Sequence, residues 1–295
     1  MAKSKVDIVA AVCKWVCFAV LSVYCITLIY PIVWMLLNSL KDEWAYSRNP
    51  FGFPDIWMWE NYAEAFKKLQ VSDPTGLKVF DIGDMFLISL FRSGAVSFLG
   101  VFFQTICSYV LARYKFAGNR FIYGLGIVVM ILPIIGNMPS AMQVARAVGT
   151  YDNLWLSVIT SPSNIFGLHF LILYGAQKAL PQDYSEAAFL DGAGHCRVMF
   201  LIMLPMVLPV CAVIFVLNFL SCWNDYTAHL IWLPSWPNLA LGLYMFQRDS
   251  TGGMLGVTRP QMFAGFTIVM IPTVILYLSA QNLVVSKFTV GGIKG

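Results

Sequence analysis

Runs of 20 or more residues without Lys, Arg, Asp or Glu recur along the chain, and this feature most constrains the fold. A helix of about 20 apolar residues crosses a hydrocarbon core of about 30 Å. Only 12% of the chain is charged, about half the usual share of a soluble domain. We therefore predict an all-α integral membrane protein with six transmembrane helices over Trp15–Asn38, Ser93–Ala112, Phe121–Ala145, Asn153–Gln177, Val198–Asn224 and Pro260–Ser286.

Prolines and a polar tetrapeptide interrupt several of these runs. Ser161-Pro162-Ser163-Asn164 falls in the fourth, so we expect its apolar helix to begin near Ile165 after a kinked or partly unwound lead-in. Pro133, Pro205, Pro209 and Pro272 predict kinks in the third, fifth and sixth runs. Such kinks serve either static packing against neighbours or rocking of half-helices around a central path.

Basic residues orient the six runs. With the N-terminus in the cytoplasm, the inside holds ten basic and four acidic residues, and the outside eight basic and ten acidic ones. The short basic connection Arg113–Arg120 is the clearest anchor. We predict an N-in, C-in topology with cytoplasmic segments 1–14, 181–205 and 287–295 and one transmembrane domain over 15–295.

An external loop, 39–84, separates the first two runs. Trp44, Trp57 and Trp59 are typical of an aromatic belt at the membrane interface. Tyr62, Phe66 and Leu69 predict a short amphipathic helix at that interface. At the outer start of the second run, we expect Arg92 to extend to lipid headgroups or to meet Asp81 or Asp84.

Signatures of catalysis are absent from the sequence. It has no P-loop, no H-E-x-x-H and no G-x-S-x-G, its three histidines are isolated, and its cysteines form no C-x-x-C pair. We therefore expect no enzymatic activity, metal site or cofactor in this chain, and the charge distribution gives no support to nucleic-acid binding. The runs also hold too few ionisable residues for a proton or sodium relay. If the chain transports a solute, the energy enters from elsewhere.

Between the fourth and fifth runs lies the segment EAAFLDGAGHCRVMFLIMLP, 186–205. We expect Asp183 or Ser185 to cap a helix there, and Ala187 and Ala188 to let another surface approach closely. Gly192 and Gly194 permit a sharp bend before the next run. The segment is either a loop that docks on a partner or a passive linker.

The spacing of this segment resembles a known family. E-A-A-x-x-x-G, nine residues and I-x-L-P form the hallmark loop of the permease subunits of binding-protein-dependent ABC importers. NSLK at 38–41, LARYKFAGNR at 111–120, CWNDY at 222–226 and FTVGGIKG at 288–295 are similar to the carbohydrate branch, specifically the maltose-type second permease.

The resemblance implies the ABC type I importer permease fold and a position in the inner membrane, with several partners: a second homologous permease, a cytoplasmic ATPase dimer that binds the ATP, and an extracytoplasmic sugar-binding protein. It also implies that the segment is a coupling helix pushed by the ATPase. The residues given this coupling role are Glu186, Ala187, Ala188, Asp191, Gly192, Ala193, Ile202, Leu204 and Pro205.

For the sugar pathway, the fifth run offers polar side chains. Asn218, Ser221 and Asp225 are spaced three and four apart, which predicts one shared helical face. Asn224 and Tyr226 adjoin them. Hydrogen bonds to the neighbouring permease account for these residues equally well. The alternative to an ABC permease is a self-sufficient secondary transporter or channel, and the sequence does not name the sugar.

Overall fold

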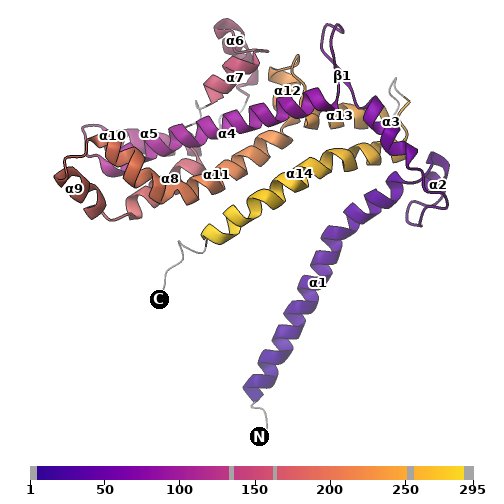
Figure 1. Cartoon of the computed structure of the whole chain (residues 1–295), viewed down its shortest axis with the longest axis horizontal. Helices are drawn as coiled ribbons and strands as arrows, with labels where there is room; N and C mark the ends of the chain where they lie inside the picture. Colours follow the sequence, from indigo (N-terminus) through magenta and orange to yellow (C-terminus); the bar gives the residue numbers. More distant parts are fainter. Residues whose placement is uncertain (1–4, 133–135, 162–164, 251–255, 289–295) are drawn as a thin grey trace. The chain divides into compact units, whose positions relative to one another are not determined.

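The computed structural model describes residues 5–132, 136–161, 165–250 and 256–288 of the chain (Figure 1). Several predicted features therefore lie outside the described residues: the kink at Pro133, the tripeptide Pro162-Ser163-Asn164 and the tail from residue 289 onward. The chain forms two compact units. Unit 1 contains 1–69 and 245–271, and unit 2 contains 70–244 and 272–295.

The described chain is almost entirely helical, with one two-stranded hairpin. In order, the elements are α1 Lys5–Ser39, α2 Glu43–Arg48, α3 Glu60–Lys68, β1 Val71–Ser72, β2 Val79–Phe80, α4 Ile82–Arg113, α5 Asn119–Ile131, α6 Met138–Val148, α7 Leu154–Thr160, α8 Leu168–Ala179, α9 Asp183–Leu190, α10 His195–Val198, the π-helical turn η2 Met199–Met203, α11 Leu204–Asn224, α12 Tyr226–Trp232, α13 Leu239–Ser250 and α14 Arg259–Phe288. The antiparallel strands pair Val71 with Phe80.

Four helical stretches of the described chain are long and apolar enough to cross a membrane: Ala10–Ser39, Ile82–Arg113, His195–Asn224 and Arg259–Ser279. They correspond to the first, second, fifth and sixth predicted spans. The second begins 11 residues earlier than predicted, at Ile82. Asp81 starts it, because its carboxylate accepts a hydrogen bond from the Asp84 backbone N–H at 2.9 Å.

The third and fourth predicted spans are each divided between two shorter helices. The third falls on α5 and α6, and the fourth on α7 and α8. In the third, Gly136 has a φ of +78°, a left-handed conformation that interrupts a helix. In the fourth, the sequence predicted an interruption after Ser161 and a helix start near Ile165, and α8 begins three residues later, at Leu168.

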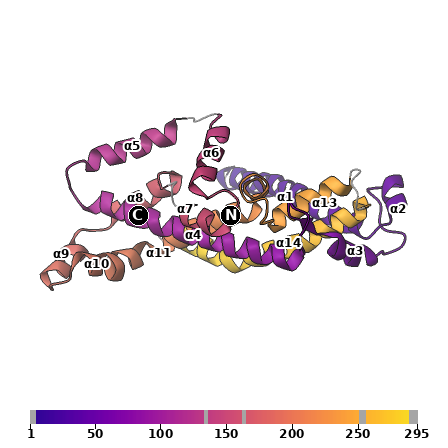
Figure 2. The same cartoon turned by 90° about the horizontal axis from the view of Figure 1, so that it is seen from above.

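Unit 2 is built around α4. This helix packs against α8 and α11, and the three helices bury Val101, Leu173, Val207, Cys211 and Ile214 in one apolar cluster. Figure 1 shows α4 and α11 running side by side. Figure 2 shows that the turn into α5 and the segment α9–α10 lie at the same end of these helices.

In unit 1, a cluster of buried, hydrogen-bonded polar groups follows α1. The Asn61 side-chain amide donates to the backbone carbonyls of Ser39 and Lys41, at 2.9 and 2.7 Å. The Ser39 hydroxyl lies 2.7 Å from the Tyr62 hydroxyl, and the Lys41 ammonium donates to the Asn49 carbonyl at 2.8 Å. Lys41 is 1% exposed, and burial lowers its pKa, partly opposed by the Asp55 carboxylate. The NSLK sequence therefore fixes how the chain leaves α1.

A short helix, α3, is present where the interfacial helix was predicted. Asn61, Ala65 and Leu69 are buried, whereas Phe66 is 57% exposed. The hydrogen bonds of Asn61 fix which side of α3 packs on the chain, and the contact of Tyr62, Phe66 and Leu69 with the membrane interface stays a prediction.

We predict that Asn61→Leu destabilises the protein by about 2 kcal/mol, because two buried carbonyls lose their donor. Thermal unfolding in detergent measures this. Lys67→Ala is the matched control on the same helix, since the Lys67 side chain is 73% exposed and makes only a surface ion pair with Glu64. Equal melting temperatures for the two variants would contradict the prediction.

Candidate functional site

The segment identified in the sequence folds as helix α9 followed by a glycine-dependent C-cap. Asp191 ends the helix, and Gly192 has a φ of +80°. The Gly192 N–H donates to the Phe189 carbonyl at 3.0 Å, and the Ala193 N–H donates to the Ala188 carbonyl at 2.9 Å. These two bonds form a Schellman motif, which favours glycine at the left-handed position. The predicted bend at Gly192 is confirmed, whereas Gly194 is extended (φ −74°, ψ 160°).

The beginning of α9 differs from the prediction. The helix begins at Asp183 without a side-chain cap, and the Ser185 hydroxyl donates to the Gln182 carbonyl at 2.7 Å. Neither predicted residue caps it. The two acidic residues of the first turn, Asp183 and Glu186, still complement the positive end of the helix.

The two alanines of the segment differ in burial. Ala187 is exposed, as are Glu186 and Leu190, the latter 89% exposed. Ala188 is 7% exposed. The prediction that both alanines admit a second surface therefore holds for Ala187 alone, because the chain itself covers Ala188.

A small cluster joins α9 to α4 and to the start of the next long helix. Ala188 is buried together with Tyr109, Val198 and Met203. Leu180, Ala193 and Ile202 pack around them. Ala193 and Ile202 are thus half-buried supports of α9 rather than parts of its outer surface.

Two side chains of the α4 terminus hold this loop, and sequence reasoning gave neither a role. Arg113 donates to the Leu180 carbonyl at 2.8 Å, before α9 begins. The Tyr114 hydroxyl lies 3.0 Å from Nδ1 of His195, just after α9 ends. The His195 ring also packs edge-on against Phe189, with the ring centroids 4.9 Å apart. In the sequence, the LARYK pattern at 111–115 indicated only the membrane orientation and the family resemblance.

The I-x-L-P part of the segment forms the entry into α11. Met199–Met203 is a π-helical turn, Met203 is buried, Leu204 is half-buried and Pro205 is exposed at the start of α11. Pro205 has no N–H to donate to the carbonyl four residues earlier, and the wide π turn directly precedes this gap. A local irregularity therefore separates the coupling segment from the long helix.

The five predicted pathway residues are not brought together. Asn218 lines a cavity of about 330 Å³ in unit 2, but Ser221 and Asn224 are exposed. Helix α11 ends at Asn224, and the Asp225 carboxylate caps α12 by accepting from the Ala228 N–H at 3.0 Å. Tyr226 stacks on Tyr244 with ring centroids 4.7 Å apart. Helix α11 thus stops one residue before Asp225, and the shared face of Asn218, Ser221 and Asp225 stays a prediction.

Arg92 is placed differently from the prediction as well. Its Nε and Nη1 atoms are buried and have no hydrogen-bond partner among the described residues. The acidic residue that acts on it is Asp225, directly after α11, and Asp81 caps α4. Arg92 therefore belongs to an internal electrostatic cluster and does not extend to headgroups.

His229 in α12 completes this cluster. It is 1% exposed, and its Nδ1 bonds the Trp236 carbonyl. Burial lowers its pKa to about 4, with a further lowering by the Arg92 charge. The Trp236 carbonyl and the Asp225 carboxylate act in the opposite direction. His229 is therefore neutral near pH 7.

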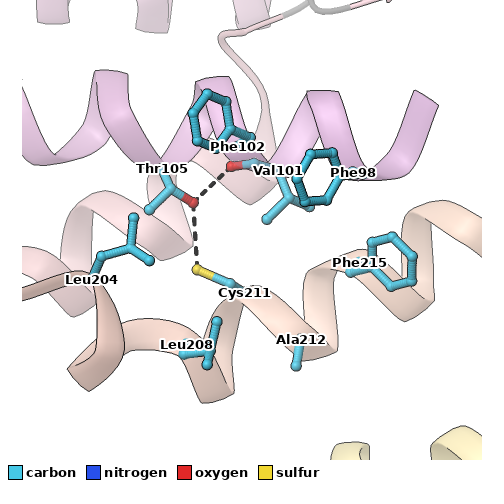
Figure 3. A pocket seen from close by; sticks show the side chains of 9 residues that line it. All are labelled: Phe98, Val101, Phe102, Thr105, Leu204, Leu208, Cys211, Ala212 and Phe215. Carbon is cyan, nitrogen blue, oxygen red and sulfur yellow. Dashed lines mark hydrogen bonds between the residues drawn. The ribbon is translucent and has the colours of Figure 1, made fainter. Parts of the chain in front are cut away.

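Two cavities of unit 2 offer different chemistry. The first, of about 310 Å³, lies between α4 and α11 and is lined almost wholly by apolar side chains such as Phe98, Leu208 and Phe215 (Figure 3). Its one hydroxyl, that of Thr105, donates to the Val101 carbonyl at 2.7 Å and lies 3.4 Å from the Cys211 sulfur. The second is the polar cavity that Asn218 lines. Among the described residues, no group of three His, Cys, Asp or Glu side chains could hold a metal ion.

The four long apolar helices of the described chain are typical of a multi-pass membrane protein. The family model described as "Binding-protein-dependent transport system inner membrane component" matches residues 104–290, well over half of the chain. The chain belongs to this family and is a permease of the inner membrane.

Relatives and a solved structure agree with this assignment. The chain is 29% identical to the diacetylchitobiose uptake system permease protein NgcG of Streptomyces coelicolor, over 92% of this chain and 86% of that protein. It is 24% identical to the melibiose/raffinose/stachyose import permease protein MelC of Bacillus subtilis, over 90% and 91%. A chain of a bacterial ABC transporter involved in the import of the acidic polysaccharide alginate has the same fold, with a TM-score of 0.75, 20% identity and coverage of 96% and 99%.

The two alanines give a matched pair of variants. We predict that Ala188→Leu destabilises the protein by about 1–3 kcal/mol, because a larger side chain overpacks the contact with Tyr109 and Met203. Ala187→Leu, with an exposed side chain, should leave the melting temperature unchanged. Thermal unfolding in detergent compares them, and equal losses would show that both alanines are buried in the protein.

The lowered pKa of His229 predicts a pH dependence of stability. Above pH 6.5 the imidazole is neutral in both the folded and unfolded states. Between pH 6.5 and about 4 only the unfolded chain takes up the proton, so stability falls as the pH falls, by on the order of 2–3 kcal/mol. His229→Gln should flatten the melting temperature over this range, and an unchanged slope would contradict the placement of His229.

Proposed function

We propose that this permease is the transmembrane subunit of an ATP-driven sugar importer. The observation that carries the proposal is α9: a rigid, glycine-capped helix with an exposed acidic and small-residue face, held at the end of α4. The relatives named for the uptake of diacetylchitobiose and of melibiose, raffinose and stachyose support a sugar as cargo. Membership of the binding-protein-dependent family supports an external binding protein as the source of that cargo.

We further propose an N-in, C-in topology with six membrane crossings. In this arrangement α5–α6 and α7–α8 supply the third and fourth crossings as broken helices, the loop 39–84 is external, and 1–14, 181–205 and 287–295 are cytoplasmic. Lys115, Arg120 and Lys178 support the orientation, because they line one cavity of about 670 Å³ at the turn into α5. That turn lies at the same end of unit 2 as α9 (Figure 2).

In this proposal, α9 couples ATP hydrolysis by a partner to the movement of the transmembrane helices. A cytoplasmic ATPase dimer binds the ATP. It contacts the exposed residues Glu186, Ala187 and Asp191, next to Gly192. The movement is then transmitted to α4 and α11 by the residues that support α9: Ala188, Ala193, Ile202, Leu204 and Pro205. A second, related permease completes the pore, and this chain itself carries out no catalysis.

A self-sufficient secondary transporter is the competing function. Such carriers keep several ionisable groups within the membrane. Arg92 lies near Asp225 and His229, and no Asp, Glu, Lys or Arg is found among the described residues that line the polar cavity. We place Asn218 in the sugar pathway, with Ser221, Asn224, Asp225 and Tyr226 at its outer end.

We predict that Glu186→Lys abolishes import while the protein still inserts and folds, because the charge reversal lies on an exposed helix face. Gly192→Leu should act similarly, since a φ of +80° costs a leucine about 1–2 kcal/mol and disrupts the C-cap. The assay is import into proteoliposomes that contain both permeases, the ATPase and the binding protein. The sugar panel consists of diacetylchitobiose, melibiose and raffinose.

Lys178→Glu is the control variant for charge reversal, because Lys178 is exposed on α8 and lies outside α9. Import that survives both Glu186→Lys and Gly192→Leu with normal ATP hydrolysis would refute the coupling role. Sugar flux through the purified chain alone, without any ATPase, would favour the secondary transporter.

A further inference from the structure

A cavity at the turn between α4 and α5 is lined by both basic and apolar side chains. Its volume is about 670 Å³, within the range of about 300–1,000 Å³ found for small-molecule sites. Its walls come from the end of α4, the turn, the start of α5 and the second half of α8. Figure 2 shows this turn at one end of unit 2. Three basic residues line the cavity: Lys115, Arg120 and Lys178.

The three cations converge from separate parts of the chain. Lys115 is in the turn, Arg120 is in the first turn of α5, and Lys178 is in the last turn of α8. All three are exposed, and no Asp or Glu is found among the described lining residues. Among the described residues, no ion pair neutralises these cations. A cytoplasmic location requires only that basic residues share one side of the membrane, not that they line one cavity. Their convergence favours an anion as the ligand.

Hydrogen bonds hold the turn in its shape. The side-chain amide of Asn119 donates to the Leu111 carbonyl at 3.0 Å and to the Tyr114 carbonyl at 2.6 Å. Gly118 has a φ of +95°, a conformation that favours glycine, and α5 begins directly after it. Gly118 and the first residues of α5 line the cavity, and no side chain caps this helix. The positive end of α5 therefore adds to the positive potential of the cavity.

A contact between α5 and α8 fixes the opposite wall. Tyr123 of α5 and Tyr174 of α8 have ring centroids 4.6 Å apart. The Lys178 ammonium lies 5.7 Å from the centroid of the Tyr174 ring, which favours its position at this wall. The cavity thus has basic groups on two sides, each positioned by contacts within the chain.

Apolar side chains border the basic ones. Phe116 and Phe121 line the cavity and are 41% and 72% exposed. Leu125 and Val128 follow Phe121 at helical spacing on α5 and are 50% and 49% exposed. A soluble anion gains nothing from such a border, whereas a phospholipid presents a phosphate and acyl chains together. Basic pockets between transmembrane helices on the cytoplasmic side bind anionic headgroups.

We infer that the cavity binds the phosphate headgroup of an anionic phospholipid from the cytoplasmic leaflet. The Arg120 guanidinium and the Lys115 ammonium bind the phosphate oxygens, and Lys178 adds positive charge from the α8 side. The acyl chains lie along Phe121 and the exposed apolar face of α5. The inference rests on the proposed topology, in which this turn is cytoplasmic and α5 is part of a membrane crossing. The site takes no part in the coupling proposed for α9.

Removal of two charges tests the headgroup site. Lys115→Gln/Arg120→Gln removes both cations of the turn, and Lys14→Gln/Arg197→Gln is the matched control, because it removes an exposed lysine and an exposed arginine that do not line the cavity. The probe is phosphatidylglycerol with a diazirine near the top of one acyl chain. It is photo-crosslinked to the complete transporter in detergent, and peptide mass spectrometry measures its attachment to residues 116–128.

The measured quantity is the half-saturating concentration of the probe. We expect it to rise about 25-fold in the cavity variant, because each basic residue near an anionic headgroup contributes about fivefold in affinity. The control should match the wild type. An unchanged value in the cavity variant, or an equal rise in the control, would overturn the headgroup site.

A charge-conserving exchange separates loss of charge from misfolding. Lys115→Arg/Arg120→Lys keeps both cations and should bind the probe within about threefold of the wild type. A loss as large as that of the double glutamine variant would show that charge does not hold the lipid and would overturn the inference.

Competitors identify the occupant of the cavity. Unlabelled phosphatidylglycerol should displace the probe, whereas phosphatidylcholine and inorganic phosphate at the same concentration should not. Equal displacement by inorganic phosphate would indicate a site for a soluble anion, and equal displacement by phosphatidylcholine would indicate binding through the acyl chains alone. Either result would overturn the inference. A transporter that binds the probe normally but imports no sugar of the panel would overturn the proposed function alone.

Discussion

The contact of Ala188 with Tyr109 is the constraint on which the rest of the coupling segment depends. Because alanine has a single methyl group, α9 lies directly on the end of α4, and Met203 closes the cluster from the η2 turn. A larger residue would separate the two helices. The small-residue pattern therefore has two separate purposes: Ala188 brings α9 onto its own chain, and Ala187 leaves the outer face open for a partner.

Helix α9 is attached at both ends to the terminus of α4, and these attachments determine which helices respond to a force on α9. Arg113 holds the chain at Leu180 before the helix, and Tyr114 contacts His195 after it. Both residues are at the terminus of α4. A force on α9 therefore acts on α4 as directly as on α11, and α4 in turn packs on α8 and α11 along the unit. The wide η2 turn, by contrast, is an irregular step between α9 and α11 and is less suited to transmit compression.

Sequence reasoning predicted what depends on local composition. Runs without charge identified the long helices α1, α4, α11 and α14, and the demand for a positive φ identified the bend at Gly192. It failed where the outcome depends on tertiary neighbours. Hydrophobicity does not distinguish one long helix from α5 followed by α6. Helical periodicity also placed Asp225 on α11, although its carboxylate caps the next helix.

Arg92 shows why a charged residue near a helix end is difficult to place from sequence alone. An extended arginine reaches water, and an internal one needs a counter-charge, and both arrangements have the same local sequence. Here the counter-charge is Asp225, which is 133 positions away and is brought near by the packing of α4 on α11. The pairing of α4 with α11 thus places a charged cluster beside a polar cavity whose described wall holds no Asp, Glu, Lys or Arg.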